Sequence, residues 1–162
     1  AEYNYEIYFH WYNVLHELGH AIMMFNASSR PHPAEEEQLV NNFAYAYWKH
    51  YGEREKLNKL CSIVGETIQK FTVPTCNNEN YLDYAKNAWG TEELFSFNNY
   101  GWFQFSSVQA AITEAPNLEQ ALNAYVPTVS HKGKLIVVSL LQFINALPPI
   151  VVHTGKSTDS NL

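Results

Sequence analysis

The sequence predicts one mainly helical domain with little or no sheet. Apolar residues recur at three- and four-residue spacing through most of the chain, whereas few segments alternate regularly between polar and apolar residues. The chain has 162 residues, 46% of them hydrophobic, which is enough to bury one core. We expect the domain to span residues 1–155 and residues 156–162 to form a flexible tail.

The first predicted helix spans about residues 5–25. Its apolar side chains recur on one face, at Trp11, Leu15, Leu18 and Ile22. A turn-rich segment at residues 26–33 ends this helix, and His32 is predicted to be a loop residue. A second helix is predicted at residues 33–51, because Pro33 suits a first helical turn and Gly52 suits a C-terminal stop.

Four more helices are predicted from the same periodicity, at about residues 53–71, 81–88, 103–115 and 118–125. Thr91 resembles a helix N-terminal signal, since acidic residues follow it directly. In the aromatic stretch that comes next, Tyr100, Gly101 and Trp102 are expected to interrupt the helical pattern.

The most apolar stretch, residues 135–147, is predicted to be a buried helix. Its β-branched residues at 136–138 leave a strand as the alternative. The stretch is too short and too polar to span a bilayer, and two prolines end it. Residues 150–152 are compatible with a short strand.

Composition excludes some classes of function. A net charge of −6 argues against nucleic acid as a partner, because phosphate binding needs a basic face. The two cysteines, Cys61 and Cys76, are too few for a cysteine-based zinc site, and their spacing does not decide whether they pair. The many tyrosines and tryptophans are expected mainly to pack the core, with a cleft lining as the alternative.

The N-terminal residues lack the basic and apolar regions of a signal peptide, which slightly favours a cytoplasmic location. The chain begins without Met, as a processed or trimmed product would, and this leaves export open. The sequence does not indicate an oligomeric state.

His16, Glu17 and His20 form an H-E-x-x-H motif inside the first predicted helix. Residues four apart stack on one helical face, so both imidazoles can bind one Zn²⁺ ion. Glu17 points about 100° round the helix, where it misses the ion but can reach a water bound to it. The motif therefore predicts a zinc peptidase in which Glu17 is the general base.

A catalytic zinc site usually has a third protein ligand, and Glu37 in the second predicted helix is the candidate. Glu35 and Glu36 are expected to be solvated acids that interact with the positive end of the helix dipole. Glu37 lies deeper in the helix and shares a face with Asn41, which could orient a ligand from behind.

His16-Glu17-Leu-Gly-His20 followed by Glu37-x-x-x-Asn41-x-Phe-Ala resembles the gluzincin pattern, and it looks most like the ImmA/IrrE group of zinc peptidases. The resemblance covers residues 10–48 and implies a Zn²⁺ ion held by His16, His20 and Glu37. The chain has Leu-Val at 39–40 where the group has Glu-Ala. Relatives in that group are associated with cleaving or relieving transcriptional repressors.

The predicted function is hydrolysis of a peptide or protein substrate by metal-activated water. Zinc peptidases commonly use a Tyr or His to hydrogen-bond the developing oxyanion, and Tyr100 and His131 are the candidates here. The alternatives are a non-catalytic, metal-stabilised interaction domain that keeps a peptidase-like fold, and a scaffold without metal.

Overall fold

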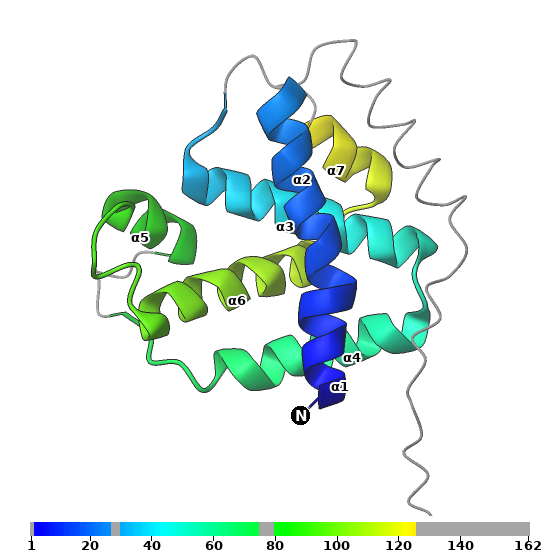
Figure 1. The fold of residues 1–162 in the computed structure, drawn as a ribbon, viewed down its shortest axis with the longest axis horizontal. Helices are drawn as coiled ribbons and strands as arrows, with labels where there is room; N and C mark the ends of the chain where they lie inside the picture. Colours follow the sequence, from blue (N-terminus) through cyan, green and yellow to red (C-terminus); the bar gives the residue numbers. More distant parts are fainter. Residues whose placement is uncertain (1, 27–29, 75–79, 126–162) are drawn as a thin grey trace, which may run out of the picture.

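The computed structural model of the chain describes residues 2–26, 30–74 and 80–125 (Figure 1). Most of these residues are helical and none of them lies in a strand, which confirms the predicted mainly helical domain. The predictions for residues 135–147 and 150–152, for the tail at 156–162, and for His131 and Cys76 lie outside the described residues.

The first helical stretch is continuous and consists of α1 (Glu2–Tyr5), η1 (Glu6–Tyr12) and α2 (Asn13–Asn26). It begins three residues before the predicted start, and η1 is a π-helix, which the sequence did not predict. The backbone N–H of Asn13 donates to the carbonyl of Tyr8, five residues earlier, and this is the π-helical hydrogen bond. As predicted, Leu15 and Ile22 of α2 are buried.

The second predicted helix is α3 (Pro33–Tyr51), which has the predicted bounds. His32 is the N-cap residue, since its Nδ1 accepts a hydrogen bond from the backbone N–H of Ala34. Gly52 ends the helix with an extended conformation rather than a left-handed one. A Cβ at Gly52 would lie 2.5 Å from the carbonyl oxygen of Trp48, so close backbone approach is the reason for glycine.

Helices α4 (Arg54–Ile68), α5 (Tyr81–Ala88) and α7 (Leu118–Tyr125) lie close to their predicted positions. Helix α6 (Phe97–Glu114) begins six residues earlier than predicted and continues through Tyr100 and Trp102. The expected interruption there is wrong, because Gly101 is a packing residue: a Cβ would lie 2.5 Å from the ring of Phe71.

The predicted helix start at Thr91 is also wrong. The Thr91 hydroxyl donates to the carbonyl of Ala88 and accepts from the backbone N–H of Leu94, so this residue closes a turn. Ser96 is the N-cap of α6, and its hydroxyl accepts from the backbone N–H of Asn99. Thr91 and Ser96 lie five positions apart and both are suitable N-cap residues in sequence, so tertiary packing decides which of them begins the helix.

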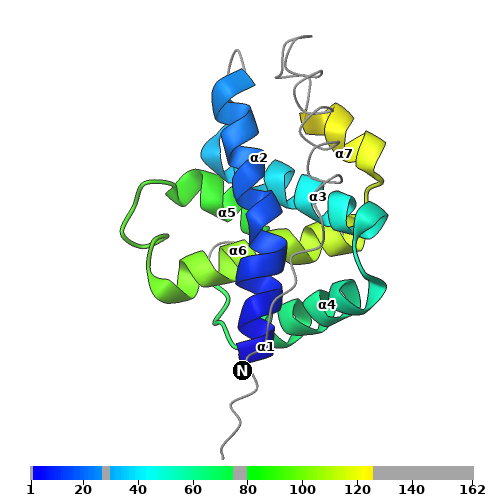
Figure 2. The same ribbon diagram turned by 45° about the vertical axis from the view of Figure 1, so that its right-hand side comes forward.

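The helices form two layers. Helices α3, α6 and α4 lie side by side, and the stretch from α1 to α2 crosses one face of them (Figures 1 and 2). The main core lies between these layers and includes the buried side chains of Tyr12, Leu15, Phe43, Tyr47, Leu60 and Val64. A second cluster joins α5 to α6. Among the described residues, no helix is both long and apolar enough to cross a membrane.

Candidate metal centre

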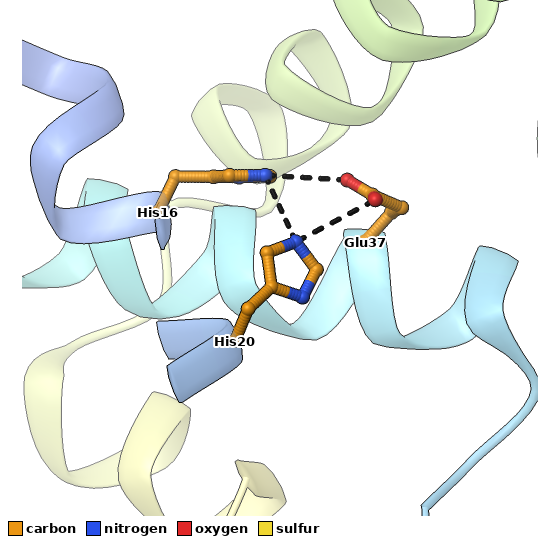
Figure 3. A group of neighbouring side chains, drawn as sticks. All are labelled: His16, His20 and Glu37. Carbon is orange, nitrogen blue, oxygen red and sulfur yellow. Dashed lines mark hydrogen bonds and ion pairs between the residues drawn. The ribbon is translucent and has the colours of Figure 1, made fainter. Parts of the chain in front are cut away.

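The three predicted ligands converge where α2 crosses α3. Figure 3 shows the rings of His16 and His20 on α2 and the carboxylate of Glu37 on α3 pointing toward one another. The two Nε2 atoms lie 3.1 Å apart. Glu37 Oε2 lies 3.2 Å from His16 Nε2, and Glu37 Oε1 lies 3.5 Å from His20 Nε2. The structure thus brings together residues that are 17 and 21 positions apart in the sequence.

These separations are suitable for a metal ion. Around a tetrahedral ion with ligands at about 2.0–2.1 Å, neighbouring ligand atoms lie about 3.3 Å apart. The three observed distances, 3.1, 3.2 and 3.5 Å, bracket that value. The group could therefore hold a first-row divalent ion with little rearrangement.

The other ring nitrogen of His16 faces Asn41, the residue expected from the sequence to orient one of the ligands. His16 Nδ1 lies 2.9 Å from Asn41 Oδ1, which also accepts a hydrogen bond from Tyr12. The amide nitrogen of Asn41 donates to Ser107 Oγ at 2.9 Å, and Ser107 Oγ donates to Gln38 Oε1 at 3.0 Å. These polar side chains are buried at the junction of α2, α3 and α6.

This network fixes the tautomer of His16. Gln38 Nε2 donates to the backbone carbonyl of Ser107, which can only accept, so the amide oxygen of Gln38 must face the Ser107 hydroxyl. The hydroxyl then donates to Gln38 and accepts from Asn41, whose oxygen is turned to His16. His16 therefore carries its proton on Nδ1 and presents the Nε2 lone pair to the centre.

Glu36 orients His20 in the same way. Glu36 Oε1 lies 2.7 Å from His20 Nδ1, and the Arg30 guanidinium forms a salt bridge with both carboxylate oxygens of Glu36. The expectation that Glu36 is a solvated acid is wrong, because its side chain is only 3% exposed. Glu35, by contrast, is partly exposed and pairs with Lys86 on α5.

The pKa values of His20 and Glu37 are shifted in opposite directions, and both shifts favour the charged forms. Burial alone lowers the pKa of His20, but the hydrogen bonds and charges of Glu37 and Glu36 outweigh it and raise the pKa to about 9. Burial raises the pKa of Glu37, yet the neighbouring His16, His20 and Gln104 outweigh burial and hold that pKa well below its usual range. With its pKa raised to about 9, His20 is protonated at neutral pH in the absence of a metal ion, and its Nε2 faces His16 Nε2 at 3.1 Å and Glu37 Oε1 at 3.5 Å.

The centre opens into a pocket of about 430 Å³. Glu17 lies on its wall with an exposed carboxylate, and Asn13 donates to that carboxylate at 3.1 Å. Tyr100 from α6 also lines the pocket, whereas the other predicted oxyanion residue, His131, is outside the described part of the chain.

Gln104, which sequence reasoning missed, fixes the orientation of Tyr100. Its amide nitrogen donates to Glu37 Oε2 at 3.0 Å and to the Tyr100 hydroxyl at 2.9 Å. A carboxylate only accepts, so the same nitrogen must face both groups, and the Tyr100 hydroxyl accepts from it. The Tyr100 proton is then available for an acceptor elsewhere. No spacing rule connects Gln104 to the motif, and only its helical position, four residues after Tyr100, links the two.

Comparisons of the chain with protein-family models, with curated proteins and with solved structures found no match.

Proposed function

We propose that the chain is a zinc-dependent peptidase. The observation that carries this proposal is the convergence of three ligand atoms whose histidine Nδ1 protons are already committed to Asn41 and Glu36. Two imidazole lone pairs and one carboxylate at mutual distances of 3.1–3.5 Å repel one another unless a cation or a shared proton lies between them.

The residues fit Zn²⁺. His16, His20 and Glu37 would hold the ion, and two histidines with one carboxylate are a ligand set of catalytic zinc sites. Each imidazole also has the hydrogen-bonded partner on its far nitrogen that metal-binding histidines usually have. When bound, zinc supplies a water of lowered pKa and polarises a carbonyl oxygen.

Glu17 and Tyr100 would carry the proton chemistry. The Glu17 carboxylate faces the pocket beside His16, where it can take a proton from water and pass it to the leaving amine. Burial and the charge of Glu37 raise the pKa of Tyr100, so its hydroxyl stays protonated at neutral pH. That hydroxyl can donate to the oxygen of the attacked carbonyl.

The test is the Glu17→Gln variant. We expect cleavage of a mixed peptide library by the zinc-loaded protein to fall by at least about 100-fold. Zinc affinity should be unchanged, because Glu17 is not a ligand. Glu6→Gln, on the same helical stretch but outside the pocket, should retain full cleavage.

Two results would contradict the proposal. Persistent cleavage by Glu17→Gln would remove Glu17 from the reaction. A wild-type protein that binds zinc but cleaves no member of the library would instead indicate the metal-stabilised interaction domain.

A further inference from the structure

The pocket beside the centre has two kinds of wall. One wall is polar and consists of His16, Glu17, His20 and Glu37. The other wall is aromatic and is formed by Tyr8 and Phe9 of η1 and Phe105 of α6. A volume of about 430 Å³ lies within the range of about 300–1,000 Å³ that holds small organic ligands.

The aromatic wall is a preformed surface. The rings of Tyr8 and Phe105 stack with centroids 4.8 Å apart at 20°, and Phe9 meets Tyr8 edge-on at 5.1 Å. Tyr8 is buried, while the Phe9 side chain is 48% exposed. A large apolar ring exposed at a pocket that also contains candidate ligands provides area that a bound apolar group would remove from water.

The charge of the pocket adds selectivity. Glu17 and Glu37 are its acidic groups, and the described residues that line it include no Lys or Arg. A Zn²⁺ ion would offset the charge of Glu37 and leave Glu17 as the acidic group of the pocket wall. An acidic side chain placed beside Glu17 would meet like charge, whereas an aromatic side chain would contact the three rings.

We infer that this pocket is a specificity subsite for a large aromatic side chain, and that the substrates are peptides with such a residue next to the cleaved bond. The inference rests on the proposed function, because it takes the polar wall as the place where the bond is cleaved. Phe9 is the residue through which the preference is exerted, since it is the most exposed ring of the wall.

The experiment measures binding rather than turnover. The zinc-loaded protein is titrated calorimetrically with acetohydroxamate, which carries only the metal-binding group, with phenylacetohydroxamate, and with the monohydroxamate of succinate. We expect phenylacetohydroxamate to bind at least about tenfold more tightly than acetohydroxamate, and the acidic compound to bind more weakly than both.

Variants connect the preference to Phe9. Phe9→Ala should reduce the advantage of the phenyl compound to less than about threefold while leaving acetohydroxamate affinity unchanged. Phe9→Leu should retain part of it. Val14→Ala is the matched control, because Val14 is 56% exposed on the same helical stretch and does not line the pocket. Peptides with Phe, Ala or Glu beside the cleaved bond should follow the same order in kcat/KM.

The outcomes separate the two proposals. Equal affinity for the acetyl and phenylacetyl compounds would overturn the subsite and leave the metal centre standing. A phenyl preference that survives in Phe9→Ala would overturn the role of this wall. Failure of every hydroxamate to bind the zinc-treated protein would overturn the proposed function, and the inference with it.

Discussion

The protons on the two imidazoles decide whether the centre can bind a cation. Each ring directs Nδ1 at an oxygen, from Asn41 for His16 and from Glu36 for His20. Each therefore directs Nε2 at the same point as the Glu37 carboxylate. Ser107 holds the Asn41 side chain by accepting a hydrogen bond from its amide nitrogen, and Arg30 holds the Glu36 carboxylate, so the rings cannot easily exchange tautomers.

Glu36→Gln tests the partner of His20. An amide would lose the charge that pairs with Arg30 and could turn its nitrogen toward His20 Nδ1, so the ring would be held less well. We expect zinc affinity, measured by competition with a chromophoric chelator, to fall by about 10- to 100-fold. Glu35→Gln is the control and should change the affinity by less than about threefold, because Glu35 is partly exposed, pairs with Lys86 at the surface and does not contact either candidate histidine ligand in the described contacts. Equal losses in the two variants would contradict the orienting role of Glu36.

Among individual residues, the sequence predicts the candidate metal ligands better than the residues that hydrogen-bond to those ligands. His16, His20, Glu37 and Asn41 follow from helical spacing, and the structure brings all four together. The burial of Glu36 and its contact with His20 could not be predicted from the sequence, because an acid in a first helical turn normally faces solvent. Its buried carboxylate pairs with Arg30, which lies six positions earlier, before the start of α3, and has no helical-periodic relation to it.

Among the elements, the π-helix η1 has the most direct effect on the site. It places Tyr8 and Phe9 on the pocket wall immediately before the helix that carries both histidines. π-Helical segments are rare and occur frequently at functional sites. Residue periodicity over so short a segment does not separate it from an α-helix, so the sequence could predict a helix here but not its type.

Two helix glycines should respond in opposite ways to Ala. Gly65 lies inside α4, where a Cβ would meet no atom within 4 Å. Gly65→Ala should therefore raise the free energy of unfolding by about 0.5–1 kcal/mol. In Gly101→Ala the new Cβ would lie 2.5 and 2.6 Å from atoms of the Phe71 ring, and we expect a loss of about 1–3 kcal/mol.

Urea unfolding of the four combinations with Phe71→Ala provides the check. The Gly101→Ala loss should largely disappear in the Phe71→Ala background, since the obstructing ring is then absent. A loss of the same size in both backgrounds would show that the helix itself, and not this contact, requires glycine. This contact is also why the start of α6 is misplaced in the prediction from sequence, because a glycine in a helical pattern is compatible with either a break or a close neighbour.

The whole molecule is organised around α3. It packs against α2, α5, α6 and α7, and it carries Glu36, Glu37, Gln38 and Asn41 within two turns. Each of these side chains contacts a group on another segment, so the site depends on the two layers meeting in register. The helical class and most helix bounds follow from periodicity in the sequence. The crossing of the layers does not, because it is set by packing between distant segments.

The pH dependence of the whole protein follows from the same groups. In protein prepared without metal, the pKa of His20 is raised from 6.5 to about 9, so its contribution to stability is complete below about pH 6.5 and is lost as the pH rises toward 9. The pKa values of Glu36 and Glu37 are lowered, so their contribution is present above about pH 4.5 and is lost as the pH falls below it. Stability without metal should therefore be greatest between about pH 4.5 and 6.5.

Zinc should reverse the alkaline part of this profile, because the ion must displace the His20 proton. Zinc affinity should rise about tenfold per pH unit up to about pH 9, and not only up to the pH of 6.5 that an ordinary histidine pKa would give. Urea unfolding at pH 5.5, 7 and 9, with and without zinc, measures both effects. Metal-free stability should fall across this series while the stabilisation by zinc grows.

The His20→Asn variant tests the assignment of this effect. The slope of metal-free stability against pH between pH 7 and 9 should vanish in His20→Asn and persist in His50→Asn, which alters an exposed histidine of α3. A metal-free protein whose stability is flat from pH 6.5 to 9 would show that no proton is held between the two imidazoles and the carboxylate.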